Sequence, residues 1–277
     1  MSPSSAILTI FAALLVLLPA RAPAEPEKPA AAMVADGALV VRVVVPLCHN
    51  DQVDCGSARA GDPDDLDHNL YWGAIFGHKR HFGRKASAYT RVSTSRAQPG
   101  VLERVVFRRE VRGAPFGRDH PVSVIVVLDA VHGDRIDQAV DEVFRAAERG
   151  DVVTIGEGDE RRTLPVDVIG YAGHNRMMDG KEPPPPLEPE EGDESSSPIP
   201  SFILACRSRQ YWQAPLEARG SRPVVMTRDL MAPEGYVLEA LVDGLARNED
   251  KAAIRRRVVA AYAKWQRIEE KVAGGIF

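Results

Sequence analysis

The sequence predicts an α/β protein with a mostly parallel central sheet covered by helices on both faces. Near-continuous apolar runs recur along the chain, and such runs are typical of strands that are buried on both faces of a parallel sheet. Amphipathic segments with helical periodicity alternate with these runs, which favours the α/β class. The composition, with 44% hydrophobic and 27% charged residues over 277 positions, is that of an ordinary globular protein.

The expected strands are the apolar runs. The first is residues 38–47, ALVVRVVVPL, which is rich in valine. Further runs predict strands at 101–111, 122–130, 166–172, 201–205 and 223–227. In a parallel sheet the carboxyl ends of the strands meet at one edge, and ligands of such proteins bind there. The residues that follow each run are therefore the candidates for function.

Four segments have the spacing of helices. Residues 69–82 predict a short amphipathic helix, and residues 134–149 predict a longer one with Asp134 as the N-cap and Gly150 as the stop. Apolar residues at intervals of three and four predict two more helices at 233–247 and 250–272. Together these segments supply the layers that cover the sheet.

The ends and loops of the expected domain are marked by composition. Residues 1–24 resemble a secretory signal peptide, with an apolar run at 6–20 and small residues before Glu25; an uncleaved anchor is the alternative. Residues 25–37 are rich in Pro and Ala and predict a linker. Residues 38–277 then form a single α/β domain, in which 181–200 is a mobile acidic loop rich in Pro and Ser. We expect an exported protein, periplasmic or extracellular, without a membrane span after cleavage.

Charge and motifs exclude several classes of function. The chain has 35 Lys and Arg against 39 Asp and Glu, and aromatic residues make up only 6%, so we expect no nucleic-acid partner. The sequence contains no P-loop, no G-x-S-x-G elbow and no H-E-x-x-H motif. We expect no cofactor and no bound metal.

The three cysteines are informative in an exported protein. Cys48 and Cys55 are seven residues apart in a loop-type stretch, so a disulfide between them is possible. Cys206 would then remain unpaired, either as an inert core residue or as a functional thiol. A disulfide between Cys206 and either of the others stays open at this point.

Two successive apolar runs are followed by residues that can carry acyl-transfer chemistry. His174 follows the run at 166–172, and Cys206 follows the run at 201–205. If the two strands are neighbours and parallel, both side chains emerge at one edge of the sheet, where the imidazole can activate the thiol. The backbone N–H groups of Asn175 and Cys206 are candidates to hold an oxyanion. His132 is a rival base, since it also follows an apolar run.

The segments VDVIGYAGHN (166–175) and SFILACRS (201–208) resemble the caspase, metacaspase and gingipain group of cysteine peptidases, often called clan CD. The resemblance extends over roughly residues 120–245 by order of elements and implies a caspase-like αβα sandwich. It also implies that His174 is the acid/base and Cys206 the nucleophile. The family's histidine is usually followed by Gly, and Asn175 takes that place here. The stretches NLYWGAIFG, GYAGHN, ACRS and MAPEGY also resemble an uncharacterised exported bacterial family.

Metal binding is a separate hypothesis. Cys48, His49, Cys55 and His68 are zinc-type ligands within a short stretch, and His78 and His81 are three residues apart on one expected helix. Their spacings match no standard zinc site. The acidic residues Asp62, Asp64, Asp65 and Asp67 resemble a calcium loop but lack the required Gly, which favours a solvated turn.

The function that the sequence supports is an exported cysteine hydrolase that cleaves peptide or amide bonds with a His174–Cys206 dyad, and its partner would be a peptide or protein substrate. The first alternative is a non-catalytic secreted or periplasmic protein that uses the same fold for binding or structure. The second is an exported metal-binding protein.

Overall fold

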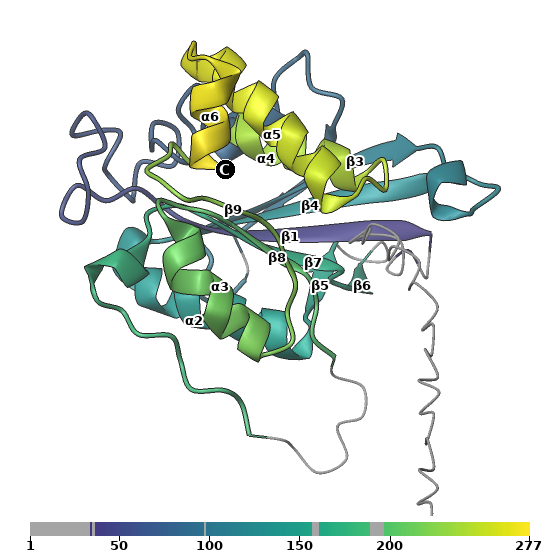
Figure 1. Ribbon diagram of the computed structural model, residues 1–277, viewed down its shortest axis with the longest axis horizontal. Helices are drawn as coiled ribbons and strands as arrows, with labels where there is room; N and C mark the ends of the chain where they lie inside the picture. The colour runs from purple at the N-terminus through teal and green to yellow at the C-terminus, as the bar shows by residue number, and fades with distance from the viewer. Residues whose placement is uncertain (1–33, 35–36, 97, 157–160, 189–196) are drawn as a thin grey trace, which may run out of the picture.

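The computed structural model describes residues 34, 37–96, 98–156, 161–188 and 197–277. A seven-stranded sheet runs through the centre of the described chain, in the order β2-β3-β4-β1-β7-β8-β9 (Figure 1). Its strands are β1 (Ala38–Pro46), β2 (Thr90–Ser95), β3 (Glu103–Val111), β4 (Val122–Val131), β7 (Val168–Ala172), β8 (Ser201–Leu204) and β9 (Pro223–Met226). β4, β1, β7, β8 and β9 are parallel; at one side β3 pairs antiparallel with β4, and β2 pairs antiparallel with β3. The predicted α/β class with a mostly parallel sheet is confirmed.

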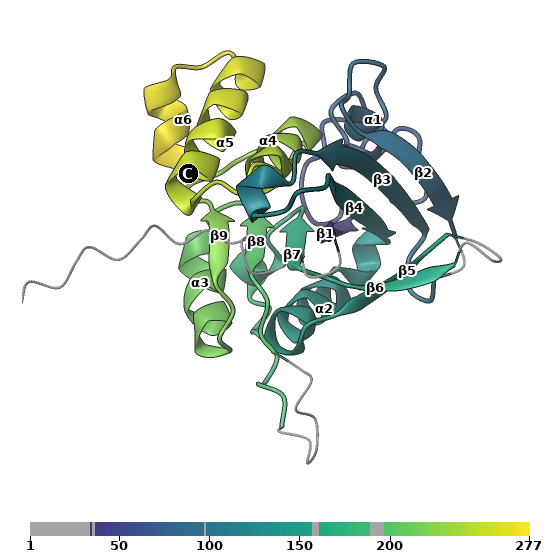
Figure 2. The same ribbon diagram turned by 90° about the vertical axis from the view of Figure 1, so that its right-hand side faces the viewer.

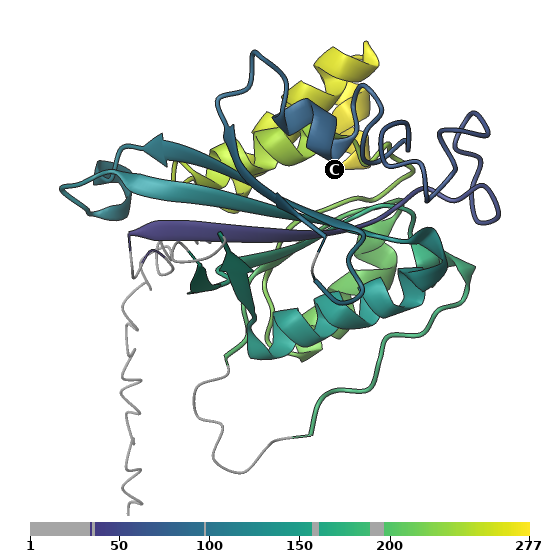
Figure 3. The same cartoon turned by 180° about the vertical axis from the view of Figure 1, so that it is seen from behind.

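Helices cover both faces of this sheet, as Figures 1 and 3 show from opposite sides. One face carries α1 (His78–Phe82), α4 (Gly235–Leu245), α5 (Lys251–Gln266) and α6 (Glu270–Ile276). The other carries α2 (Ile136–Arg149) and α3 (Ser208–Ala218), together with the small hairpin of β5 (Val152–Ile155) and β6 (Arg162–Pro165) (Figure 2). Short 3-10 helices span Ala114–Phe116 (η1), Gly133–Arg135 (η2) and Arg176–Asp179 (η4).

The central strand β1 shows why the apolar runs form this sheet. Leu39, Val41 and Val43 belong to the large core under α4 and α5, whereas Val40 and Val44 face the opposite side. Successive side chains of a strand point to opposite faces, so a strand between two helical layers must be apolar at almost every position. The valine-rich run therefore becomes the middle of the sheet.

The segment 69–82 is helical only from His78, contrary to the prediction. A Cβ on Gly73 would lie 2.2 Å from the Leu66 carbonyl oxygen, and one on Gly77 would lie 2.4 Å from that of Trp72. Such close backbone approaches belong to tight turns, which only glycine permits. The turns are held by Asn69, whose side chain bonds the N–H and C=O of Cys48 and the N–H of Tyr71.

Two other helices differ in detail from the prediction. The helix at 134–149 begins at Ile136, and Asp134 is not its N-cap; the ring of His132 instead accepts the Asp134 N–H at 3.2 Å. The segment 250–272 is divided at Arg267, which has φ 56 and ends α5 before α6 begins. A residue in the left-handed region cannot continue a right-handed helix.

Other predictions fall partly or wholly outside the described residues. The signal peptide at 1–24 lies outside them, as does the linker at 25–37 except for Val34 and Gly37. In the acidic loop, 181–188 and 197–200 contain no helix or strand, and 189–196 lie outside the described residues. The disulfide between Cys48 and Cys55 is present. Within the described ranges, no helix has the length and apolar character that a membrane crossing requires.

Candidate functional site

The carboxyl ends of β7 and β8 form the candidate site. The two strands are adjacent and parallel, and Ala172 is paired with Leu204 in their register. His174 and Cys206 each lie two residues beyond this pair, one at the end of each strand. The topology therefore brings both residues to the same edge of the sheet, as the sequence predicts.

Cys206 is a free, half-buried thiol. Its Sγ lies 3.4 Å from both the backbone nitrogen and the backbone oxygen of Met231, in the segment between β9 and α4. Tyr71 and Tyr262 share this environment: burial raises the pKa of each phenol, and the neighbouring Cys206 thiol adds to the effect. The sulfur is thus enclosed by segments that lie far apart in the sequence.

His174 is held from two sides. Its Nε2 lies 2.6 Å from the Asp179 carboxylate, which belongs to the short helix η4 that follows β7. Its backbone carbonyl accepts a hydrogen bond of 2.6 Å from the hydroxyl of Tyr171. A carboxylate at Nε2 favours the tautomer that carries its proton there, which leaves Nδ1 as the basic nitrogen. The sequence analysis missed Asp179, although a carboxylate five residues after the histidine was visible in the chain.

Asn175 has a structural role that the sequence did not predict. Its side chain is fully buried, donates from Nδ2 to the carbonyl of Cys206 at 2.6 Å, and accepts from the Trp212 indole N–H at 2.9 Å. Asn175 therefore ties the end of β7 to the Cys206 turn and to helix α3. A glycine at this position, the residue usual in the clan CD group, would have no side chain for these bonds.

The backbone around Cys206 is arranged for a turn into a helix. Arg207 has φ 49, in the left-handed region, and α3 begins at Ser208. Among the described residues, the backbone N–H groups of Asn175 and Cys206 donate to no protein acceptor.

The described residues contain no hydrogen bond between the His174 ring and the Cys206 sulfur. Such pairs are often long or poorly aligned before substrate binds. Both residues lie beyond the last residue of their strands, so strand alternation does not fix the side they face. The Cys206 sulfur contacts Met231 of the core under α4 and α5, whereas Asp179, the partner of His174, belongs to η4, which packs against α2 and α3. The tertiary structure thus supports a shared edge of the sheet for the two groups.

Four segments quoted from the sequence meet around Cys206. Asn175 of GYAGHN bonds the carbonyl of Cys206 in ACRS, and Met231 of MAPEGY contacts its sulfur. The Gly235 N–H donates to the Phe76 carbonyl, which joins MAPEGY to NLYWGAIFG. These stretches thus build one local structure at the edge of the sheet.

The rival base His132 lies elsewhere on this edge. It follows β4, and β1 and β7 separate β4 from β8 in the sheet. Its Nδ1 accepts the N–H of Asp134 at the start of η2. This contact explains His132 as the residue that caps the following helical turn.

The zinc hypothesis based on Cys48, His49, Cys55 and His68 is wrong for its two thiols, because they form the disulfide. His68 instead contacts Asp65 at 2.8 Å. The paired imidazoles also differ: His81 contacts Glu239 at 3.0 Å, whereas both ring nitrogens of His78 are buried without a hydrogen bond. Within the described part of the chain, no group of three or more His, Cys, Asp or Glu side chains has an arrangement that could hold a metal ion.

The acidic stretch expected as a solvated turn has that structure. The backbone at 62–68 forms turns in which Asp62 accepts the Asp64 N–H and Asp65 accepts the His68 N–H. Asp64 is largely exposed. These carboxylates are used for local turn bonds and contacts with nearby basic groups.

The role of Asn175 leads to a prediction. Asn175→Ala is expected to lower the free energy of unfolding by about 1–3 kcal/mol, because it leaves the buried indole N–H of Trp212 without an acceptor. Urea denaturation followed by tryptophan fluorescence would measure this change. The exposed Asn50→Ala serves as a turn-residue comparison. An Asn175→Ala protein as stable as the parent would contradict the bridging role.

In comparisons with known proteins, no family model, no curated protein and no solved structure matches this chain.

Proposed function

We propose that this protein is an exported cysteine hydrolase with a caspase-like arrangement, which cleaves peptide or amide bonds with Cys206 as nucleophile and His174 as acid and base. The observation that carries the proposal is the in-register parallel pairing of β7 and β8, which brings both residues to one edge of the sheet. A nucleophile, a base and backbone donors near one another are the parts that acyl transfer requires.

The contact of His174 with Asp179 supports the assignment of the base. The carboxylate orients the ring and stabilises the imidazolium that forms when the ring takes up a proton. Cys206, His174 and Asp179 then act as nucleophile, base and orienting group, in that order. Asp179 acts on the reaction only through His174.

The reaction would proceed in two stages. The Cys206 sulfur attacks the carbonyl carbon of the substrate, and its proton passes to Nδ1 of His174. The N–H groups of Asn175 and Cys206 would hold the oxyanion. The C–N bond then breaks as His174 returns the proton to the leaving amine, and a thioester remains. Water, deprotonated by His174, hydrolyses the thioester, which releases the acid and restores the thiol.

Export is part of this proposal. The apolar segment at 6–20 has the length of a signal-peptide core, and the Cys48–Cys55 disulfide is the type of bond that persists in oxidising compartments. An extracytoplasmic peptide or protein is accordingly the proposed substrate.

The thiol provides a direct test. Iodoacetamide is expected to label Cys206 of the folded protein rapidly at neutral pH, and His174→Ala to slow this labelling at least about tenfold, because a paired imidazole increases the thiolate fraction. Asp179→Asn should slow it less. Labelling is measured by mass spectrometry of the intact protein, with His132→Ala as the matched control at another strand end. Equal rates for the parent and the His174→Ala protein would overturn the dyad.

The contact between Cys206 and Met231 favours a second candidate. A sulfur held 3.4 Å from the backbone of Met231 suits a thiol that packs and does not react. We therefore carry, as the alternative, a non-catalytic exported protein that uses this fold for binding or structure. It predicts slow labelling that is indifferent to His174→Ala.

A further inference from the structure

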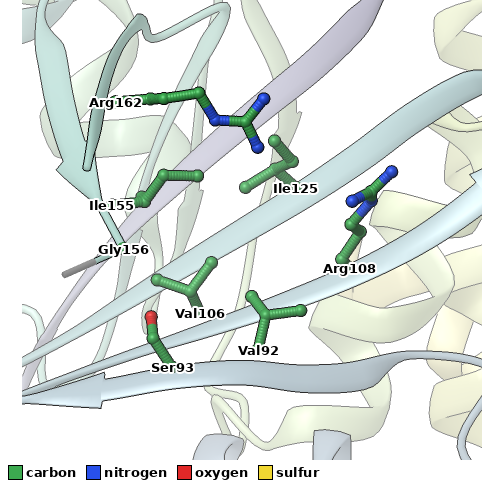
Figure 4. A pocket seen from close by; sticks show the side chains of 8 residues that line it. All are labelled: Val92, Ser93, Val106, Arg108, Ile125, Ile155, Gly156 and Arg162. Carbon is green, nitrogen blue, oxygen red and sulfur yellow. The ribbon is translucent and has the colours of Figure 1, made fainter. Parts of the chain in front are cut away.

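A pocket of about 630 Å³ lies between the β5–β6 hairpin and the β2–β3–β4 part of the sheet (Figure 4). It is separate from the candidate site, because β1 and β7 lie between β4 and β8. The size is within the range of about 300–1,000 Å³ that is usual for small-molecule sites. Neither its residues nor its location have a role in the proposed hydrolysis.

The floor of the pocket is apolar. It consists of Val92 on β2, Val106 on β3, Ile125 on β4 and Ile155 on β5. Val106, Ile125 and Ile155 are buried, but Val92 is 51% exposed although it lies on the sheet. A cavity lined by aliphatic side chains favours an apolar occupant.

Two guanidinium groups border this floor, and their environments differ. The guanidinium of Arg108 forms an ion pair with Glu110 at 2.6 Å and donates a hydrogen bond to the Ser123 hydroxyl at 2.9 Å. Arg162 extends from β6 over the floor (Figure 4), and its guanidinium makes no ion pair or hydrogen bond with any of the described residues. Among the described residues, the pocket therefore has a guanidinium without a partner beside an apolar surface.

A second pocket of about 540 Å³ adjoins the first. The two share Ser93, Val106, Ile155 and Gly156 as lining residues, so they form one elongated groove between β2 and β5. An elongated groove accommodates an extended chain better than a compact ring system.

We propose that this groove binds an amphipathic carboxylic acid with a flexible aliphatic chain. Its carboxylate would pair with Arg162, whose planar fork matches the two carboxylate oxygens. Its chain would lie over Val92, Val106 and Ile155. The guanidinium of Arg162, which has no partner among the described residues, complements the negative charge of a carboxylate. This inference is independent of the proposed hydrolase activity.

Calorimetric titration of the full chain with octanoate tests the proposal, with octylamine and 1-octanol as probes of the same chain length. Octanoate is expected to bind at least about tenfold more tightly than either, because a charge-assisted hydrogen bond contributes on that scale. Arg162→Gln should weaken octanoate binding by a similar factor. Val92→Trp should abolish it, since the larger side chain at this half-exposed position enters the groove.

Arg91→Gln is the matched control, because it removes the same charge from the exposed strand β2 at a position outside the pocket lining. It should leave octanoate binding within about twofold of the parent protein, since an exposed charge outside the groove has little effect. Equal binding of octanoate and octylamine would overturn the proposal. So would an absence of octanoate binding, or binding that Arg162→Gln and Arg91→Gln weaken equally. Circular dichroism confirms that each variant is folded.

Discussion

Asp129→Leu is expected to lower the free energy of unfolding by about 3–5 kcal/mol, because it leaves buried positive charge without its negative partner. Asp129 on β4 is fully buried. Its carboxylate accepts from Arg42 at 2.8 Å and from Arg104 at 2.6 and 2.7 Å. Arg42 keeps two further partners, Glu142 and Asp151, whereas Arg104 keeps only the Thr154 carbonyl at 3.5 Å. The substitution therefore removes the charged partner of Arg104, whereas Arg42 keeps two carboxylates.

The electrostatics of Arg42 agree with this interpretation. Burial by itself lowers the pKa of its guanidinium, but the carboxylates of Asp129, Glu142 and Asp151 outweigh burial and raise the pKa above its usual value. The buried charge of Arg42 is thus compensated by three carboxylates. The members of the network around Asp129 come from β1, β3, β4, α2 and the segment before β5, so they join the sheet to the helix that covers it.

Urea denaturation of a double-mutant cycle measures this effect. The double variant Asp129→Leu/Arg104→Met is expected to recover a large part of the lost stability, because it removes the unpaired guanidinium of Arg104 together with the carboxylate of Asp129. Asp51→Leu, at a side chain that is 89% exposed, is the control and should change stability little. The prediction fails if Asp129→Leu costs less than about 1 kcal/mol, the size of an exposed pair, or if the double variant is no more stable than the single one.

His78 is expected to make the fold sensitive to acid. His78 is fully buried in α1, and neither of its ring nitrogens has a hydrogen-bond partner among the described residues. Burial, followed by repulsion from His81, lowers its pKa from 6.5 to about 3, while the nearby Pro233 backbone acts in the opposite direction without completing a hydrogen bond. The folded protein therefore holds His78 neutral at pH values where the unfolded chain would protonate it.

The sign of the pH dependence follows from these pKa values. Above pH 6.5 the ring is neutral in both states, so His78 adds no pH dependence. Between pH 6.5 and about 3 only the unfolded chain binds the proton, so the free energy of unfolding falls as the pH is lowered. The gap between the two pKa values corresponds to at most about 5 kcal/mol.

The His78→Leu variant isolates this contribution. Lowered carboxyl pKa values, such as that of Glu239, also destabilise the protein in acid and occur in both proteins, so the difference between the two curves belongs to His78. Urea midpoints measured from pH 7 to pH 4 should fall less steeply for His78→Leu than for the parent. The exposed His120→Leu is the control. Parallel curves for the parent and His78→Leu would show that the buried ring is protonated as readily as a free one.

Local sequence predicted the elements with a strong periodic signal. The strands β1, β4, β7 and β8 correspond to the apolar runs, and α2 corresponds to the amphipathic segment at 134–149. The elements that were missed lack such a signal. β2 is a mostly exposed edge strand with the polar sequence TRVSTS, and α3 contains Pro215 and buries only Ser208, Trp212 and Leu216. Their structure depends on the surface they pack against.

The candidate site shows the same division. That His174 and Cys206 follow buried strands was visible in the chain, because strand ends are a local property. The partners of those residues were not, since Asn175 contacts the Cys206 carbonyl across 31 positions and Met231 contacts its sulfur across 25. Contacts over such separations depend on which strands become neighbours.

The sequence by itself determined the α/β class, the strands of the central sheet other than β2, and the residues at their carboxyl ends, because burial on both faces requires apolar side chains at nearly every strand position. Only the tertiary structure decided that Asp179 contacts His174, that Asn175 is a buried bridge to the Cys206 carbonyl, and that a groove opens beside β2 with a guanidinium that has no partner among the described residues. These features arise where side chains of distant segments meet, and hydrophobic periodicity carries no information about those meetings.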